Sequence, residues 1–268
     1  LSREHGGLVS LRDATLPGGA REYVTAPPRL ITWRPLTDND RGAGTGFTAA
    51  QWFGAGRFAR VADHTVRMDG ATGELVGETR YELAEPKRTP VTVRWRVDGD
   101  AALRLELEYE GETGPDLPLL GLEWHLPLDC ANVEFYGLGP DETYADRQSG
   151  KLGVWRTAAA DTAPYLVPQE TGQHLYTRWA KVTDADGHGL RIDATDVAGY
   201  AFSLLPYSTL MLEEARHQGE LPKPSSMVLR LIAAQDGVGG DDSWGAPVHA
   251  RYRVRARART LVVRISMI

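Results

Sequence analysis

The chain has 268 residues, of which 42% are hydrophobic and 25% charged, the composition of an ordinary globular domain near the upper end of the single-domain size range. A net charge of −6 and scattered arginines argue against nucleic acid or an anionic membrane surface as a partner. Cys130 is the only cysteine, so no intrachain disulfide can form, and we expect a cytoplasmic protein. The sequence shows no signal peptide and no apolar run that could span a bilayer, and Leu1 in place of Met suggests a piece of a longer polypeptide.

Short segments separated by 29 glycines and 16 prolines are typical of an all-β fold. Residues 102–110 show the clearest strand pattern, because leucines and a tyrosine alternate with charged residues and so give one buried face and one wet face. Strands are predicted at residues 1–12, 91–98, 102–110, 119–128, 133–136, 174–182, 189–194, 199–205, 227–233, 249–259 and 260–267. One domain over residues 1–268, made of two large packed sheets, is the simplest arrangement.

Few helices are expected. An extended segment at residues 32–42 leads into a polar, glycine-rich loop. Residues 48–60 are predicted to form a short helix with Trp52 and Phe53 on its buried side, and residues 208–217 form a second.

Residues 237–247 concentrate special residue types around one tryptophan. Three glycines, Asp241, Asp242 and a serine precede Trp244, and these residue types favour tight turns. An indole held rigidly at the surface suits the apolar face of a sugar or a partner protein, because it offers a large contact area with little rotamer entropy to lose. The alternative is a connecting loop whose Trp244 packs under a sheet.

Glycoside hydrolysis with retention needs two carboxyl groups about 5 Å apart. Asp141, Glu142 and Asp146 form the densest acidic cluster, but a turn whose acids are neutralised by Arg147 explains the same residues. The paired aspartates before the loop tryptophan are likewise expected to shape that loop. No catalytic residue is therefore predicted in this chain.

No metal site is predicted either. The seven histidines are spread singly, without metal-ligand spacing. The run at residues 38–40 has oxygen ligands but lacks the alternate spacing of a calcium loop. A nucleophile elbow and a phosphate-binding glycine loop are also missing from the sequence.

Four motifs together resemble the C-terminal domain, or separate small chain, of family 2 β-galactosidases. Residues 35–42 resemble Pro-x-x-Asp-Asn-Asp-x-Gly, and residues 136–147 resemble Tyr-Gly-x-Gly-Pro-x-Glu-x-Tyr-x-Asp-Arg. Residues 168–172 resemble Pro-Gln-Glu-Asn-Gly, with Thr171 in place of Asn, and residues 239–244 complete the set as Gly-Gly-Asp-Asp-Ser-Trp. The resemblance runs from about Leu1 to the C-terminus.

The resemblance implies a large antiparallel β-sandwich of the galactose-mutarotase type, packed against a (β/α)8 barrel that carries the catalytic glutamates. It implies that Trp244 reaches the mouth of that barrel as a platform for the aglycone, with Asp241 and Asp242 on the same loop. Asn39 and Asp40 are expected on the side that rims the same pocket. These five residues are the predicted substrate-binding set, and the retaining chemistry belongs to the absent barrel.

The partners implied by the resemblance are the barrel and other domains of the same enzyme, or a large subunit, together with a β-D-galactoside such as lactose. No cofactor is expected in this chain, although Mg²⁺ and Na⁺ could bind other domains of the full enzyme. The full enzyme is expected to be oligomeric, and neither nucleic acid nor a membrane is expected as a partner.

Two other functions remain open. An aldose 1-epimerase of the same sandwich type would need an acid and a base on a concave face, for which His125, His174 and Glu170 are candidates. A free-standing carbohydrate-binding module would use the loop tryptophan with Trp155 or Trp179.

Overall fold

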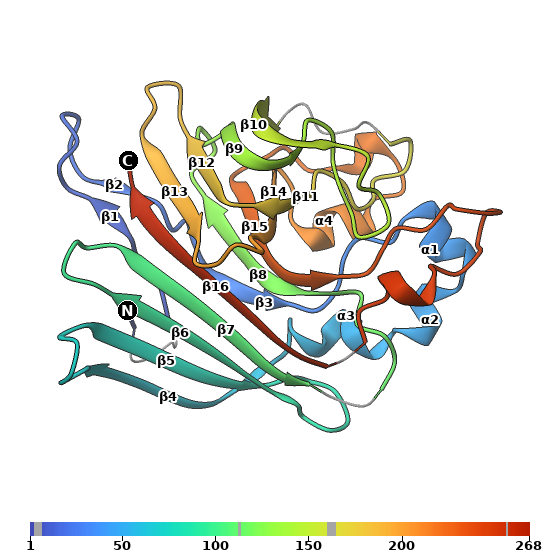
Figure 1. Cartoon of the computed structure of the whole chain (residues 1–268), viewed down its shortest axis with the longest axis horizontal. Helices are drawn as coiled ribbons and strands as arrows, with labels where there is room; N and C mark the ends of the chain where they lie inside the picture. Colours follow the sequence, from blue (N-terminus) through green and yellow to red (C-terminus); the bar gives the residue numbers. More distant parts are fainter. Residues whose placement is uncertain (3–6, 112–113, 160–164, 256) are drawn as a thin grey trace.

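The computed structural model describes residues 1–2, 7–111, 114–159, 165–255 and 257–268, and its described strands form two large antiparallel sheets and one small sheet (Figure 1). The larger sheet has nine strands in the described part of the chain, in the spatial order β10 (Lys151–Ala158), β9 (Asn132–Gly139), β12 (Trp179–Thr183), β13 (Gly189–Ala194), β16 (Arg257–Met267), β7 (Leu103–Gly111), β6 (Pro90–Val97), β5 (Leu75–Glu82) and β4 (Arg60–Met68). The described strands of the second sheet are five, in the order β11 (His174–Thr177), β14 (Tyr200–Leu205), β15 (Met227–Gln235), β8 (Leu119–Leu126) and β3 (Ala26–Ile31). The small sheet pairs β1 (Arg12–Asp13) with β2 (Arg21–Glu22).

Strand β7 shows how the sequence produces the two faces of the larger sheet. Its leucines and Tyr109 are buried, while Arg104 and Glu110 are exposed, as the alternation predicts. On the wet face, Arg94 Nη1 of β6 lies 2.8 Å from Glu108 Oε2 of β7, so neighbouring strands also pair through charges.

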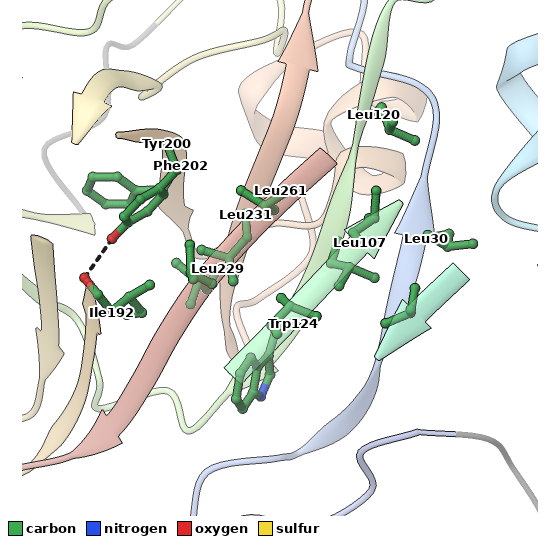
Figure 2. Close-up of a cluster of buried hydrophobic side chains, with 14 of the residues drawn as sticks. Leu30, Leu107, Leu120, Trp124, Ile192, Tyr200, Phe202, Leu229, Leu231 and Leu261 are labelled. Atoms are coloured by element: carbon green, nitrogen blue, oxygen red, sulfur yellow. Dashed lines mark hydrogen bonds between the residues drawn. The ribbon is translucent and has the colours of Figure 1, made fainter. Parts of the chain in front are cut away.

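The core lies between the two large sheets (Figure 2). Leu107 and Leu261 come from the nine-stranded sheet and lie with Leu229 of the five-stranded sheet in the same buried cluster. Trp95 of β6 and Trp124 of β8 contact each other edge to face across the sheets, with ring centroids 5.8 Å apart. The prediction of an all-β antiparallel sandwich is therefore confirmed.

Helices are short, and the described residues contain four α-helices rather than the one or two expected. They are α1 (Asp38–Gly42), α2 (Thr45–Thr48), α3 (Gln51–Ala55) and α4 (Thr209–Glu214). Within α3, Trp52 is fully buried as predicted, but Phe53 is 41% exposed. None of the described helices is long and apolar enough to cross a membrane.

The stretch at residues 174–182 is not the single strand that we predicted. β11 pairs with β14 in the five-stranded sheet, whereas β12 pairs with β9 and β13 in the nine-stranded sheet. The chain changes sheets at Arg178, whose N–H donates to Tyr136 O at 2.8 Å, directly after the positive φ of Tyr176. Residues 174–182 contain no glycine or proline that would mark the crossing, so the sequence alone does not reveal it.

The predicted strand at residues 249–259 is wrong except for residues 257–259, which begin β16. Ala250–Tyr252 is a 3-10 turn, and Arg257 is the first residue of β16. Backbone groups of this segment serve loop contacts instead of a ladder: Val254 O accepts from Leu117 N at 2.8 Å. Residue 256 lies outside the described residues.

Other strand boundaries differ from the prediction as well. In the expected strand at residues 1–12, Ser2 and Gly7 form an isolated bridge, and residues 3–6 lie outside the described part. The sequence analysis did not identify β3, β4, β5 and β10, three of which end a sheet.

Candidate functional site

The four motif stretches meet at one end of the sandwich. They come from the β3–α1 connection, the turn after β9, the approach to β11, and the loop between β15 and β16. In Figure 1 the β15–β16 loop, in orange and red, extends beside α1 and α2. Hydrogen bonds join these segments, which are up to two hundred residues apart in the sequence, into one network.

Helix α1 begins at Asp38 because Thr37 caps it. Thr37 Oγ1 accepts from Asp40 N at 3.1 Å, and the Asp40 carboxylate accepts from Thr37 N at 3.0 Å, which is a capping box. Arg34 is buried and pairs with the same carboxylate at 2.9 Å. Burial acts to lower the pKa of Arg34, but attraction to Asp40 and Glu170 outweighs it, so the pKa is raised and the guanidinium keeps its charge.

Arg34 also holds the beginning of the β15–β16 loop. Its Nη1 donates to Asp236 O at 2.5 Å, and its Nη2 donates to Gly237 O at 2.7 Å. Gly237 N in turn donates to Tyr252 O at 3.0 Å, so both sides of the loop base are connected. A cavity of about 370 Å³ adjoins this base and is lined in part by Arg34 and Asp236.

Asp146, from the second motif, binds the loop just after its base. Its two carboxylate oxygens accept from Val238 N at 2.9 Å and from Gly239 N at 2.7 Å. A Cβ at Gly237 would lie 2.3 Å from Asp146 Oδ2, so this approach requires glycine.

Asn39, on α1, binds the far side of the loop. Its Nδ2 donates to Ala246 O at 3.0 Å, and its Oδ1 accepts from Gly245 N at 3.1 Å. The backbones of Gly42 and Gly245 touch, since a Cβ on Gly42 would lie 2.7 Å from Gly245 Cα. Trp244 therefore sits immediately before two residues that are fixed to α1.

The third motif ties the first motif to the core. Gln169 Oε1 accepts from Asp38 N at 3.1 Å, and Glu170 N donates to Pro35 O at 3.2 Å. The Glu170 carboxylate is completely buried and forms a two-pronged ion pair with Arg230 of β15, at 2.7 and 2.8 Å.

Glu142 joins the second motif to the third. Its carboxylate accepts from Arg147 Nη1 at 2.8 Å, Thr171 Oγ1 at 2.9 Å, Gly172 N at 2.7 Å and Tyr165 OH at 2.5 Å. Arg147 thus neutralises the Glu142 carboxylate, as the turn interpretation expects.

Trp244 is 75% exposed, so the alternative in which it packs under a sheet is wrong. Asp241 and Asp242, on the same loop, are exposed as well. The Asp241 carboxylate lies 3.9 Å from His249 Nε2, at the end of the loop. The structure thus gathers these three predicted residues on one projecting segment.

Asn39 and Asp40 lie beside the loop, in the lining of the cavity at its base, but protein contacts occupy their side chains. The Asp40 side chain is 4% exposed, and its carboxylate is engaged by Arg34 and by the cap of α1, so it braces the site instead of meeting a ligand at the surface. The amide of Asn39 is occupied by the loop backbone. Sequence analysis missed Asp146 as an anchor and missed Phe47, which is 90% exposed on α2.

The three residues considered for an epimerase are not brought together. His125 on β8 lies 3.4 Å from Glu123, whereas His174 on β11 lines a cavity of about 350 Å³ beside Glu142. Burial lowers the pKa of His174 to about 4. Glu170 is fully engaged with its arginine, which leaves it unable to act as a base.

The described residues contain one group of acids and histidine with ligand atoms within 4.8 Å of one another, namely Asp184, Asp186 and His188. Asp184 Oδ1 accepts from the backbone N–H groups of both other residues, at 2.9 Å each, and Oδ2 pairs with Arg21 at 2.7 Å. These are the contacts of the turn between β12 and β13.

Asp236, at the base of the loop, titrates in the neutral range. Burial raises its pKa from 3.8 to about 7, supported by the nearby carboxylates of Asp116 and Asp40, while the Val254 N–H and Arg34 oppose the shift. Because the folded state binds this proton more tightly than the unfolded state does, the contribution of Asp236 to stability falls as pH rises from about 4 to about 7.

We expect Asp236→Asn to melt several degrees above the parent protein at pH 8 and close to it at pH 4.5. Asparagine resembles the protonated acid and still accepts from Val254 N–H. Thermal melts across this pH range measure the difference, and Asp38→Asn, whose side chain is exposed on α1, serves as the control. A difference between Asp236→Asn and the parent that does not change with pH would contradict the prediction.

The fold and the site define an antiparallel β-sandwich domain that projects an exposed indole on a braced loop. The family described as β-galactosidase small chain matches residues 1–265, so the chain belongs to that family and the resemblance seen in the four motifs is confirmed.

Known proteins similar to this chain are β-galactosidases. The chain is 53% identical to the β-galactosidase BgaC of Bifidobacterium adolescentis, over 95% of this chain and 24% of that protein. It is 37% identical to a β-galactosidase of Streptococcus thermophilus, over 94% of this chain and 24% of that protein. A β-galactosidase small subunit of Latilactobacillus sakei is 33% identical, over 95% of this chain and 87% of the subunit. The chain thus spans about a quarter of the length of the first two relatives.

The GalM/aldose epimerase homologue from C. elegans aligns with 97% of this chain and 92% of its own, at a TM-score of 0.42 and 9% identity.

Proposed function

We propose that this chain is the part of a retaining β-galactosidase that supplies Trp244 to the substrate pocket and packs against a separate catalytic barrel. The observation that carries the proposal is an exposed indole on a loop that Asn39 and Asp146 hold from outside. Glu142 and Glu170 are occupied by structural donors, so they are poor candidates for proton transfer. An indole carries no group that could act as an acid or a base, so Trp244 is suited to binding a sugar rather than cleaving it.

The substrate class is a terminal β-D-galactoside such as lactose, on which the indole would contact the aglycone. The substrate class is supported by the relatives, which are β-galactosidases. The need for further polypeptide is supported by the length of this chain, about a quarter of theirs. The partner is then the remaining polypeptide, whether a large subunit or linked domains. Phe47 is exposed on α2, which follows the first motif in the sequence, and it adds apolar surface for that partner.

The test is complementation. The purified chain alone should hydrolyse no nitrophenyl galactoside, and mixing it with the missing polypeptide should produce hydrolysis. The two separate preparations are the controls. Sustained turnover by the chain alone, abolished by Asp141→Asn or Glu142→Gln, would show that the chain carries its own catalytic acids.

A further inference from the structure

We infer that Asn39 and Asp146 are positioning residues that fix the place of Trp244, so that substrate affinity depends on two side chains outside the loop that bears the indole. This inference rests on the proposed function for its kinetic consequence. Its structural content, the fixing of the loop, is tested independently of activity.

The loop contains little that could hold it in place by itself. Between Val238 and Ala246, one described backbone bond closes within the loop, from Ala246 N to Ser243 O at 2.9 Å. Glycine at positions 239, 240 and 245 adopts positive φ, from 72° to 90°, so the backbone is intrinsically adaptable there. Residues 240–244 are exposed and gain nothing from burial. A loop of this composition needs outside contacts to keep one conformation.

Asn39 provides a pair of contacts that straddles one peptide unit. Its amide donates to the carbonyl of Ala246 and accepts from the N–H of Gly245, so both polar atoms of the side chain are used. Asn39 itself stands on a helix that is capped and tied to a buried arginine. The residue after Trp244 is therefore fixed to the rigid part of the protein.

Asp146 holds the other end of the loop. Two successive amides, those of Val238 and Gly239, donate to its two carboxylate oxygens, and an ionised acceptor makes these bonds stronger than neutral ones. Gly239 also touches Asn39, because a Cβ there would lie 2.1 Å from Asn39 Nδ2. Both anchors thus contact Gly239, and together they restrain the loop from both ends.

In the complete β-galactosidase, Asn39→Ala should speed hydrogen exchange at the amide of Gly245 and its neighbours, and Asp146→Ala should do so at Val238 and Gly239. Both should raise KM for lactose about three- to tenfold, with a smaller change in kcat, since the catalytic groups are untouched. Asn39→Asp keeps the acceptor for Gly245 N–H and loses the donor, so its KM should fall between the parent and Asn39→Ala.

A matched control is Asn132→Ala. Its Nδ2 donates to the carbonyl of Asp184 at 3.0 Å, the same kind of side-chain contact in the turn after β12. This variant should change neither exchange in the loop nor KM. If Asn39→Ala does not fold, the milder Asn39→Asp and the Asp146→Ala variant carry the same test.

A double variant decides whether the anchors act through the indole. Trp244→Leu with Asn39→Ala should have the KM of Trp244→Leu alone, because no indole remains to position. Fully additive effects would overturn the inference, and so would unchanged exchange and KM in both anchor variants. If loop exchange rises while KM stays unchanged in Trp244→Leu and in both anchor variants, the anchors do fix the loop, and the proposed role in substrate binding is what fails.

Discussion

Replacing Glu170 by glutamine is expected to lower the free energy of unfolding by about 3–5 kcal/mol. The carboxylate and Arg230 are both almost completely buried and bond each other twice, while Arg230 Nε also donates to Ser203 Oγ at 2.7 Å. Glutamine leaves the guanidinium charged in the core without the carboxylate that bonds it twice. A thermal or urea unfolding curve of the chain gives the loss directly.

An exposed pair provides the comparison. Arg60 and Glu82 lie 2.6 Å apart at the surface between β4 and β5, and Glu82→Gln should cost far less stability than Glu170→Gln. The double variant Glu170→Leu with Arg230→Met should be more stable than Glu170→Gln, because it buries no lone charge. Equal losses for the buried and the exposed pair would contradict this account of the core.

In the complete enzyme, Trp244→Leu is expected to raise KM for lactose about tenfold and to change kcat less. An indole face stacked on a pyranose contributes about 1–2 kcal/mol by analogy with other aromatic contacts, and 1.4 kcal/mol corresponds to a factor of ten. The effect should be smaller for a nitrophenyl galactoside, whose ring keeps apolar contact with leucine. Trp244→Phe should be milder because it retains an aromatic face.

Trp244→Leu should leave the melting temperature of the chain unchanged, since the indole is exposed. Trp179→Leu is the matched control: this tryptophan lies on β12, flanked by Lys181 and Arg191, and belongs to no part of the loop. A rise in KM for Trp179→Leu equal to that for Trp244→Leu would favour the binding-module alternative. Unfolding caused by Trp244→Leu, or unaltered kinetics, would show that the indole has no substrate role.

The sequence predicts the sandwich well where one strand face is buried and the other wet. β7 and β13 follow their alternation because each lies in the middle of the larger sheet with a core on one side. The prediction from alternation fails at residues 249–255, where the same pattern accompanies a 3-10 turn. Alternation records which side chains are apolar, but it does not say whether the backbone groups pair in a ladder.

The site could be predicted only in part for a related reason. Special residue types around Trp244 indicate a shaped loop, and the structure exposes the indole. Asn39 and Asp40, however, were expected to share a role, and they point to different partners because α1 separates neighbouring side chains by about 100°. The capping pattern of Thr37 and Asp40 was present in the sequence and would have predicted this helix. The contact of Asp146 with the loop joins residues more than ninety positions apart and leaves no local sequence signal.

The hydrogen bonds from Arg34 to the carbonyls of Asp236 and Gly237 have a consequence for thermal unfolding. The guanidinium is buried, so the loop base cannot detach without leaving N–H donors of Arg34 in the interior without acceptors. The projecting end should therefore stay assembled until the whole sandwich melts. Loss of substrate affinity and loss of β-structure should then coincide in temperature, and an enzyme containing this chain should have no warm, folded but weakly binding state.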